Sequence, residues 1–168
     1  GAAQRAIEAA ASAAGRIDAL LNVAGGFSWA KTADAGADLY ARMQARNLIT
    51  ALNASRAALP HLLASSGAIV NVGAAGALKA GVGMGAYAAS KAGVHKLTEA
   101  MAEEYKGQVR VNAVLPSIID TPQNRKDMPD ADPSLWVAPA DLARVMLFLA
   151  SDAAPAVTGA LVPVTGRV

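Results

Sequence analysis

The chain has 168 residues, of which 54% are hydrophobic, and this is enough for one globular domain or part of one. Its fifteen Lys and Arg residues are scattered and leave a net charge of only +2, so we expect no nucleic-acid partner. The absence of cysteine and of any apolar run as long as a membrane span argues against disulfides and a membrane partner, and favours a cytoplasmic protein.

The predicted elements alternate between helices and strands. In chain order they are a helix at 2–14, a strand at 17–24, a helix at 35–63, a strand at 67–73, a helix at 84–105, a strand at 109–116, a helix at 139–150 and a strand at 160–165. The helices are rich in alanine or repeat apolar residues at helical spacing, and the strands are short apolar runs bounded by Gly or Pro. We expect Pro60 to kink or end its helix, and a polar, proline-rich excursion at 117–138.

This alternation predicts an α/β fold with a parallel sheet and right-handed crossovers. Sheets of this kind bind ligands at the carboxyl ends of their strands. Those ends are followed here by residues that let a backbone approach a ligand closely, namely Gly25-Gly26, Gly73-Ala74, Pro116-Ser117 and Thr165-Gly166. The Gly-x-Gly-x-x-Gly turn that binds a dinucleotide pyrophosphate is absent from this chain.

Tyr87 and Lys91 lie four residues apart in the predicted helix 84–105, so they share one helix face. Two charges at ~5 Å in an effective dielectric of ~20 interact by about 3 kcal/mol, enough to lower a phenol pKa by roughly two. A tyrosine with such a pKa can transfer a proton near neutral pH. The alternative is a chance pair, in which the tyrosine covers a core and the lysine extends to solvent.

Four segments in order give the chain a family resemblance. They are Asn22-Val-Ala-Gly25 after a strand, Asn47 in the next helix, Tyr87-x-x-x-Lys91, and Asn112-Ala-Val-Leu-Pro116, with Thr158-Gly159 near the end. The chain resembles the short-chain dehydrogenase/reductases along its whole length. The resemblance implies a Rossmann-like, doubly wound parallel sheet, of which residues 1–168 would form the C-terminal part, with about four strands and flanking helices. The N-terminal dinucleotide-binding strands would be missing, so we expect a piece of a longer reading frame that binds no nicotinamide cofactor alone.

The resemblance also implies roles for single residues. Tyr87 would donate a proton, Lys91 would lower its pKa and hold the nicotinamide ribose, and Asn47 would position a water that relays protons to Lys91. The central sheet would be stabilised, and the ribose side of the cofactor lined, by Asn22, Ala24 and Gly25. The nicotinamide end would be covered by Pro116, Ser117, Ile118, Ile119 and Thr121. The implied cofactor is NADH or NADPH, the substrate a small molecule, and the assembly a homodimer or homotetramer formed through the two long helices.

Ala74 departs from the family pattern. Members usually have a serine about thirteen residues before the tyrosine, which donates a hydrogen bond to the substrate carbonyl, and such a donor is worth a factor of about 100 to 1,000 in rate. The dihydropteridine reductase branch also lacks this serine, and the tail here is similar to that branch in Asp120-Thr-Pro122, Met128-Pro129 and Trp136. A quinonoid dihydropterin is therefore one expected substrate. The alternatives are a carbonyl or alcohol oxidoreductase with a substitute donor such as Ser117, and a catalytically impaired nucleotide-binding or scaffold protein.

Three further residues have ordinary interpretations. His61 and His95 have no clustered carboxylates, so we expect no metal site. Trp136 lies in the polar excursion, where it is either a lid over the substrate or an anchor for the loop.

Overall fold

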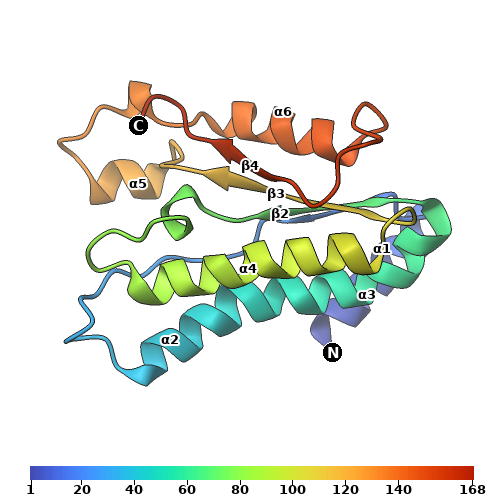
Figure 1. The fold of residues 1–168 in the computed structure, drawn as a ribbon, viewed down its shortest axis with the longest axis horizontal. Coiled ribbons are helices and arrows are strands. Elements are labelled where there is room, and N and C mark those ends of the chain that lie inside the picture. Colours follow the sequence, from blue (N-terminus) through green and yellow to red (C-terminus); the bar gives the residue numbers. More distant parts are fainter.

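The sheet has four parallel strands in a computed structural model that describes residues 1–168. They are β1 (Ala19–Asn22), β2 (Ala68–Val72), β3 (Arg110–Pro116) and β4 (Leu161–Val164), in the spatial order β1-β2-β3-β4. All four predicted strands are confirmed, with shorter bounds. β2 stops where its predicted run reaches Gly73, whereas β1 already stops at Asn22, before Val23 and Ala24. The sheet and its flanking helices confirm the predicted α/β class (Figure 1).

Six α-helices surround the sheet. They are α1 (Ala2–Ala14), α2 (Ala37–Met43), α3 (Thr50–Ser65), α4 (Gly85–Glu104), α5 (Pro122–Asp127) and α6 (Pro139–Ala150). The predicted helix 35–63 is thus divided, with a π-helical segment at Gln44–Ile49 joining α2 to α3. The expectation for Pro60 was wrong in one respect, because α3 continues past it to Ser65 and is capped by Ser66, which has a left-handed φ of 51°. Ala58 and Leu62, buried on either side of Pro60, hold this turn against the core.

Helices cover both faces of the sheet, so the fold is doubly wound (Figure 1). Successive side chains of a strand point to opposite faces. Ile69 of β2 packs with side chains of α3 and α4, whereas its neighbour Val70 packs with side chains of α6. Because the strands follow one another in a single direction across the sheet, the crossover through α6 has the opposite hand to those through α3 and α4. The expectation that all crossovers share the usual right hand was therefore wrong.

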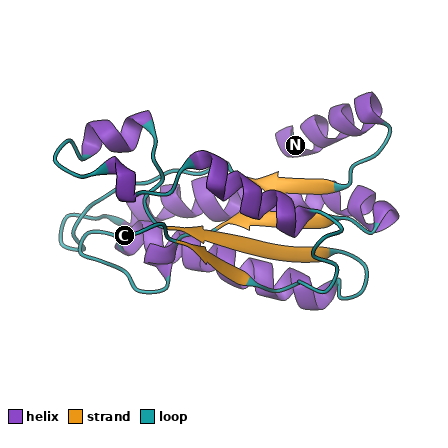
Figure 2. Ribbon diagram, turned by 90° about the horizontal axis from the view of Figure 1, so that it is seen from above, coloured by secondary structure: helices purple, strands orange, loops and turns teal.

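The β1 edge of the sheet is sparsely covered. No side chain of α1 is buried, and this helix packs against α3 beside the sheet (Figure 2). Leu21 on β1 is 40% exposed, and Leu147 and Phe148 on α6 are 60% and 49% exposed. An unpaired strand edge with apolar side chains beside it is a surface that proteins normally cover. None of the helices combines the length and the apolar character needed to cross a membrane.

Candidate active site

A cleft of about 980 Å³ opens at the carboxyl ends of β2 and β3. This is the edge at which parallel α/β sheets bind ligands. Eight of the predicted site residues line it, namely Gly25, Tyr87, Lys91, Pro116, Ser117, Ile118, Ile119 and Thr121. Three others, Asn22, Ala24 and Asn47, lie outside its lining. The structure therefore brings together predicted residues from three separate parts of the sequence.

Tyr87 and Lys91 reach the cleft from the first turns of α4. Lys91 is 6% exposed, and its Nζ donates a hydrogen bond of 2.7 Å to the carbonyl oxygen of Val72 at the end of β2. Burial lowers the pKa of Lys91 to about 8. Burial also raises the pKa of Tyr87, because a phenolate loses hydration there. The expected lowering of the Tyr87 pKa by Lys91 is thus not found in this structure, where loss of hydration dominates.

Asn47 is buried in the π-helical segment, a geometry common at functional sites. Its Oδ1 accepts a hydrogen bond of 2.8 Å from the Gly26 amide, and its Nδ2 donates to the Gly26 carbonyl at 3.0 Å and to Ser90 Oγ at 2.8 Å. The Ser90 hydroxyl in turn donates to the Tyr87 carbonyl at 2.7 Å. Asn47 therefore ties the Gly25-Gly26 turn to the helix that carries Tyr87. No direct hydrogen bond joins Asn47 to Lys91. The expected role of Asn47 does not need one, because a water molecule would lie between the two side chains.

Gly25 stands where a larger residue has no room. A Cβ at this position would lie 2.8 Å from Asn47 Oδ1 and 3.4 Å from Lys91 Nζ. Glycine therefore lets the turn pass close to both side chains.

Asn22 joins β1 to its neighbours beneath the cleft. Its Nδ2 donates to Ser55 Oγ at 3.0 Å and to Asn71 Oδ1 at 2.8 Å. Asn71 Nδ2 continues the network to Thr98 Oγ1 at 2.9 Å. These bonds hold α3 and α4 to the sheet, so Asn22 supports the cleft from outside, and Ala24 is an exposed residue of the following turn.

His95 is a site residue that the sequence reasoning missed. It is buried, and its Nε2 accepts a hydrogen bond of 3.2 Å from the amide of Ala74 in the cleft wall. Burial, followed by the charge of Lys91, lowers the pKa of His95, in keeping with a neutral ring that accepts. A Cβ on Gly73 would lie 2.5 Å from the same nitrogen. His95 lies two helix turns after Tyr87, on about the same face of the helix. This spacing is the sequence feature from which its place near the cleft could have been predicted.

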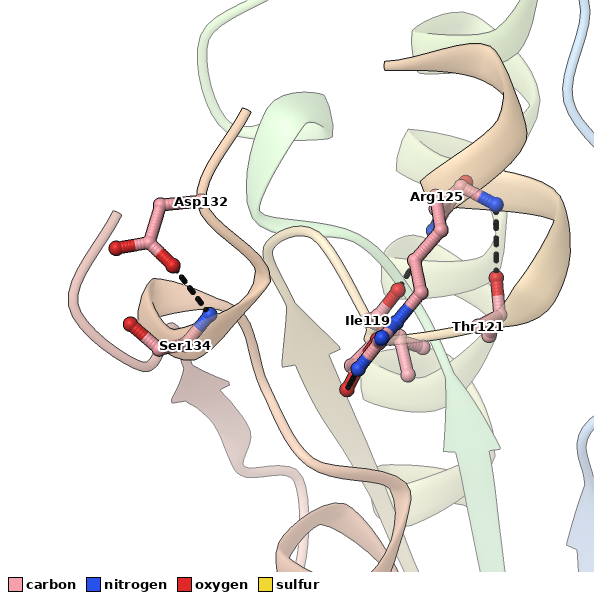
Figure 3. Close-up of polar contacts among 7 residues, drawn as sticks. Ile119, Thr121, Arg125, Asp132 and Ser134 are labelled. Atoms are coloured by element: carbon pink, nitrogen blue, oxygen red, sulfur yellow. Dashed lines mark hydrogen bonds and ion pairs between the residues drawn. The ribbon is translucent and has the colours of Figure 1, made fainter. Parts of the chain in front are cut away.

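The segment after β3 forms the opposite wall. Ser117 Oγ donates to the Thr165 carbonyl at 2.6 Å, so this hydroxyl proton is already in use and Ser117 is a poor substitute for the missing serine. Thr121 accepts from the Asn124 amide at 3.1 Å and caps α5, which the ion pair of Asp120 with Arg125 also holds (Figure 3). Trp136 is 6% exposed and does not line the cleft, so it anchors the loop and is not a lid.

An aromatic wall, Phe27 and Trp29, was also missed. The rings of Phe27 and Tyr87 meet edge to face with centroids 5.0 Å apart. Trp29 Nε1 donates to the Val82 carbonyl at 2.8 Å, and the Ala30 amide donates to the Gly83 carbonyl at 2.9 Å. Two loops more than fifty residues apart in sequence are thereby fastened together. An aromatic residue directly after Gly25-Gly26 was the only sign of this wall in the sequence.

Residues 1–166 match the family model described as enoyl-(acyl carrier protein) reductase. The chain belongs to the short-chain dehydrogenase/reductase family. It is 38% identical over 161 residues to meso-2,3-butanediol dehydrogenase of Serratia marcescens, a match that covers 90% of this chain and 64% of that enzyme. It is also 36% identical over 179 residues to inactive 2-(S)-hydroxypropyl-CoM dehydrogenase 2 of Xanthobacter autotrophicus, covering 96% of this chain and 77% of that protein.

A solved structure agrees with the chain in fold. Carveol dehydrogenase from Mycobacterium avium, in complex with NAD, superposes with a TM-score of 0.88 and 30% identity, over 98% of this chain and 69% of that one. The family resemblance drawn from the Asn22, Tyr87 and Asn112 motifs is thus confirmed. The chain spans somewhat less than two thirds of the length of the Serratia enzyme.

Proposed function

We propose that this protein is an NAD(P)-dependent oxidoreductase that interconverts an alcohol and a carbonyl compound. In the balanced reaction, a ketone, NAD(P)H and a proton give a secondary alcohol and NAD(P)⁺. The observation that carries the proposal is the pair of half-buried Tyr87 and buried Lys91, which line the cleft over the carboxyl ends of the strands together. The family membership of the chain supports the same reaction class.

Tyr87 would give its phenol proton to the substrate oxygen on which negative charge develops. A phenol is protonated at neutral pH, as a proton donor requires, but burial raises the Tyr87 pKa and makes it a weaker acid, so the transfer would depend on stabilisation of the phenolate. Lys91 would stabilise the phenolate that remains, since the ammonium lies one helix turn away on the same face. Asn47 would fix the geometry of this pair through Gly26 and Ser90.

The residues present fit the nicotinamide end of the cofactor. Pro116, Ile118 and Ile119 offer an apolar strip for a flat ring, Thr121 offers a hydroxyl beside it, and Lys91 offers an ammonium for ribose hydroxyls. When bound, NADH or NADPH supplies the hydride. The chain has no glycine-rich turn for the pyrophosphate, so we propose that this part of the site belongs to strands outside residues 1–168. The exposed β1 edge with Leu21 supports that proposal.

The substrate class has two candidates. A secondary alcohol or its ketone is supported by the name of the Serratia relative, a butanediol dehydrogenase. A quinonoid dihydropterin is supported by Ala74, because a conjugated ring spreads the developing charge and has less need of a serine hydroxyl at that point. The Ser117 hydroxyl donates its hydrogen bond to the Thr165 carbonyl. A ketone substrate would therefore lack the donor that was expected to replace the missing serine.

A catalytically impaired protein is the third possibility, supported by a relative that is itself named inactive. The burial of Lys91 and Asn47 beside Tyr87 argues for activity, because a scaffold gains nothing from a lysine whose charge is costly to bury. We propose in addition that the active protein is a cytoplasmic homodimer or homotetramer, on the strength of the family resemblance.

The decisive experiment follows nicotinamide absorbance at 340 nm with the protein expressed from its full reading frame. The substrates are quinonoid dihydropterin, a set of ketones and the corresponding alcohols, each with both cofactors. Tyr87→Phe is expected to reduce turnover at least 1,000-fold while cofactor binding remains, because the phenyl ring keeps its contact with Phe27 but has no proton to give. Turnover that survives this change would contradict the proposed role of Tyr87. Tight cofactor binding without any turnover would favour the impaired protein.

A further inference from the structure

Apolar side chains form a large part of the cleft lining. Apart from those assigned to the nicotinamide end, they include Phe27, Trp29, Ala74, Ala75, Met84, Met128 and Val168. Sites for small molecules combine such surfaces with a few polar groups that fix orientation. Here the polar group at the reacting position is the Tyr87 hydroxyl, so the apolar lining would meet the remainder of the substrate.

The charges along the cleft disfavour an anion. Its lining contains one basic side chain, Lys91, and the proposed function commits that ammonium to the cofactor ribose and to Tyr87. It contains one acidic side chain, Asp127, whose carboxylate accepts a hydrogen bond of 2.8 Å from Gln123. A carboxylate in the substrate would therefore lose hydration against apolar walls, find no free cation and be repelled by Asp127.

The aromatic side chains at the mouth are exposed but held in place. Phe27 is 55% and Trp29 56% exposed, although both are large apolar residues. Phe27 is fixed by its edge-to-face contact with Tyr87, and Trp29 by its hydrogen bond to Val82. Gly83, at φ 74°, lies under the Trp29 ring so closely that a Cβ there would overlap with it. Rigid aromatic surfaces beside a reacting group are suited to a flat apolar ligand.

We propose that the cleft selects uncharged substrates that carry an aromatic or cyclic apolar group next to the reacting carbon, and that Phe27 and Trp29 determine this preference. The inference rests on the proposed function, since it takes Tyr87 as the reacting position. A cleft with this preference would disfavour hydroxy acids and anionic carrier-bound compounds as substrates.

The test compares two secondary alcohols that differ in one group. 1-Phenylethanol has a methyl where mandelate has a carboxylate. Each is titrated into the ¹⁵N-labelled protein from the full reading frame, as the Tyr87→Phe variant with saturating NAD⁺ or NADP⁺, so that no turnover occurs. The indole N–H resonance of Trp29 reports occupancy of the cleft, and that of the buried Trp136 is the internal control. A Trp29→Phe spectrum assigns the two resonances.

We expect 1-phenylethanol to shift the Trp29 resonance and to bind at least tenfold more tightly than mandelate. Phe27→Ala is expected to weaken this binding at least fivefold, whereas Leu78→Ala, which changes an exposed apolar residue outside the cleft lining, is expected to leave it unchanged. Equal or tighter binding of mandelate, no binding of 1-phenylethanol, or undiminished binding by Phe27→Ala would overturn the inference. Failure of the proposed function is a separate result, namely no nicotinamide-dependent turnover by the protein that retains Tyr87.

Discussion

Replacement of Lys91 by methionine should change how stability depends on pH. Burial lowers the pKa of Lys91 to about 8, from 10.5 for an exposed lysine. Between these values the unfolded chain binds more protons than the folded chain, so the buried charge destabilises the protein below pH 8 and the penalty is relieved as the pH rises toward 10.5. The penalty at pH 7 is about 3 kcal/mol, since each pKa unit corresponds to ~1.4 kcal/mol.

The assay is urea unfolding at several pH values between 7 and 10. Relative to Lys91→Met, the native protein is expected to gain about 2 to 3 kcal/mol of unfolding free energy across this range. The methionine also leaves the Val72 carbonyl without its donor, which costs about 1 to 3 kcal/mol at every pH. For that reason the test is how the difference in unfolding free energy between the two proteins changes with pH, and not its absolute size.

Lys96→Met is the matched control, because Lys96 lies on the same helix with a side chain 78% exposed. Its curve is expected to run parallel to that of the native protein. If the Lys91→Met curve were also parallel between pH 7 and 10, the lysine would titrate normally in the folded protein, and the argument from burial would be refuted.

Two more predictions concern His95 and Trp29. Since the folded state lowers the pKa of His95, the native protein should lose stability relative to His95→Gln as the pH falls below about 6.5, measured as urea midpoints; identical pH profiles would contradict this. Gly83→Ala and Gly107→Ala both force alanine into a positive φ, 74° and 77°, but only Gly83 has a side chain, Trp29, in the way. Gly107→Ala should cost about 1 kcal/mol and Gly83→Ala at least ~1 kcal/mol more in thermal unfolding, and equal losses would disprove the contact with Trp29.

The sequence was informative where neighbours along the chain decide the structure. Tyr87 and Lys91 could be paired because four residues span one helix turn, and β2 could be recognised because its apolar run ends at Gly73. The continuation of α3 past Pro60 was missed, because burial of Ala58 and Leu62 outweighs the loss of one backbone hydrogen bond.

The hand of the α6 crossover was not predictable from local pattern. β2 and β3 are apolar on both faces, so their sequences do not say which face a helix will cover. Phe27 and His95 were missed for a related reason. Phe27 meets Tyr87 across sixty positions of sequence, and His95 meets Ala74 across the boundary between a helix and a strand end. Contacts between residues so far apart in the chain produce no periodic pattern in the sequence from which they could be predicted.

The Asn47 side chain has a consequence for how the site forms during folding. It joins Gly26, 21 positions earlier, to Ser90, 43 positions later. Gly26 lies in the same crossover as Asn47, whereas Ser90 lies on α4 in the next crossover, so the two links coexist only once α4 has packed against the π-helical segment. Contacts between such distant positions form late, because loop closure must precede them. A chain in which α4 has not docked would therefore lack the Asn47–Ser90 hydrogen bond, so this link across the candidate site should form only as the sheet is completed.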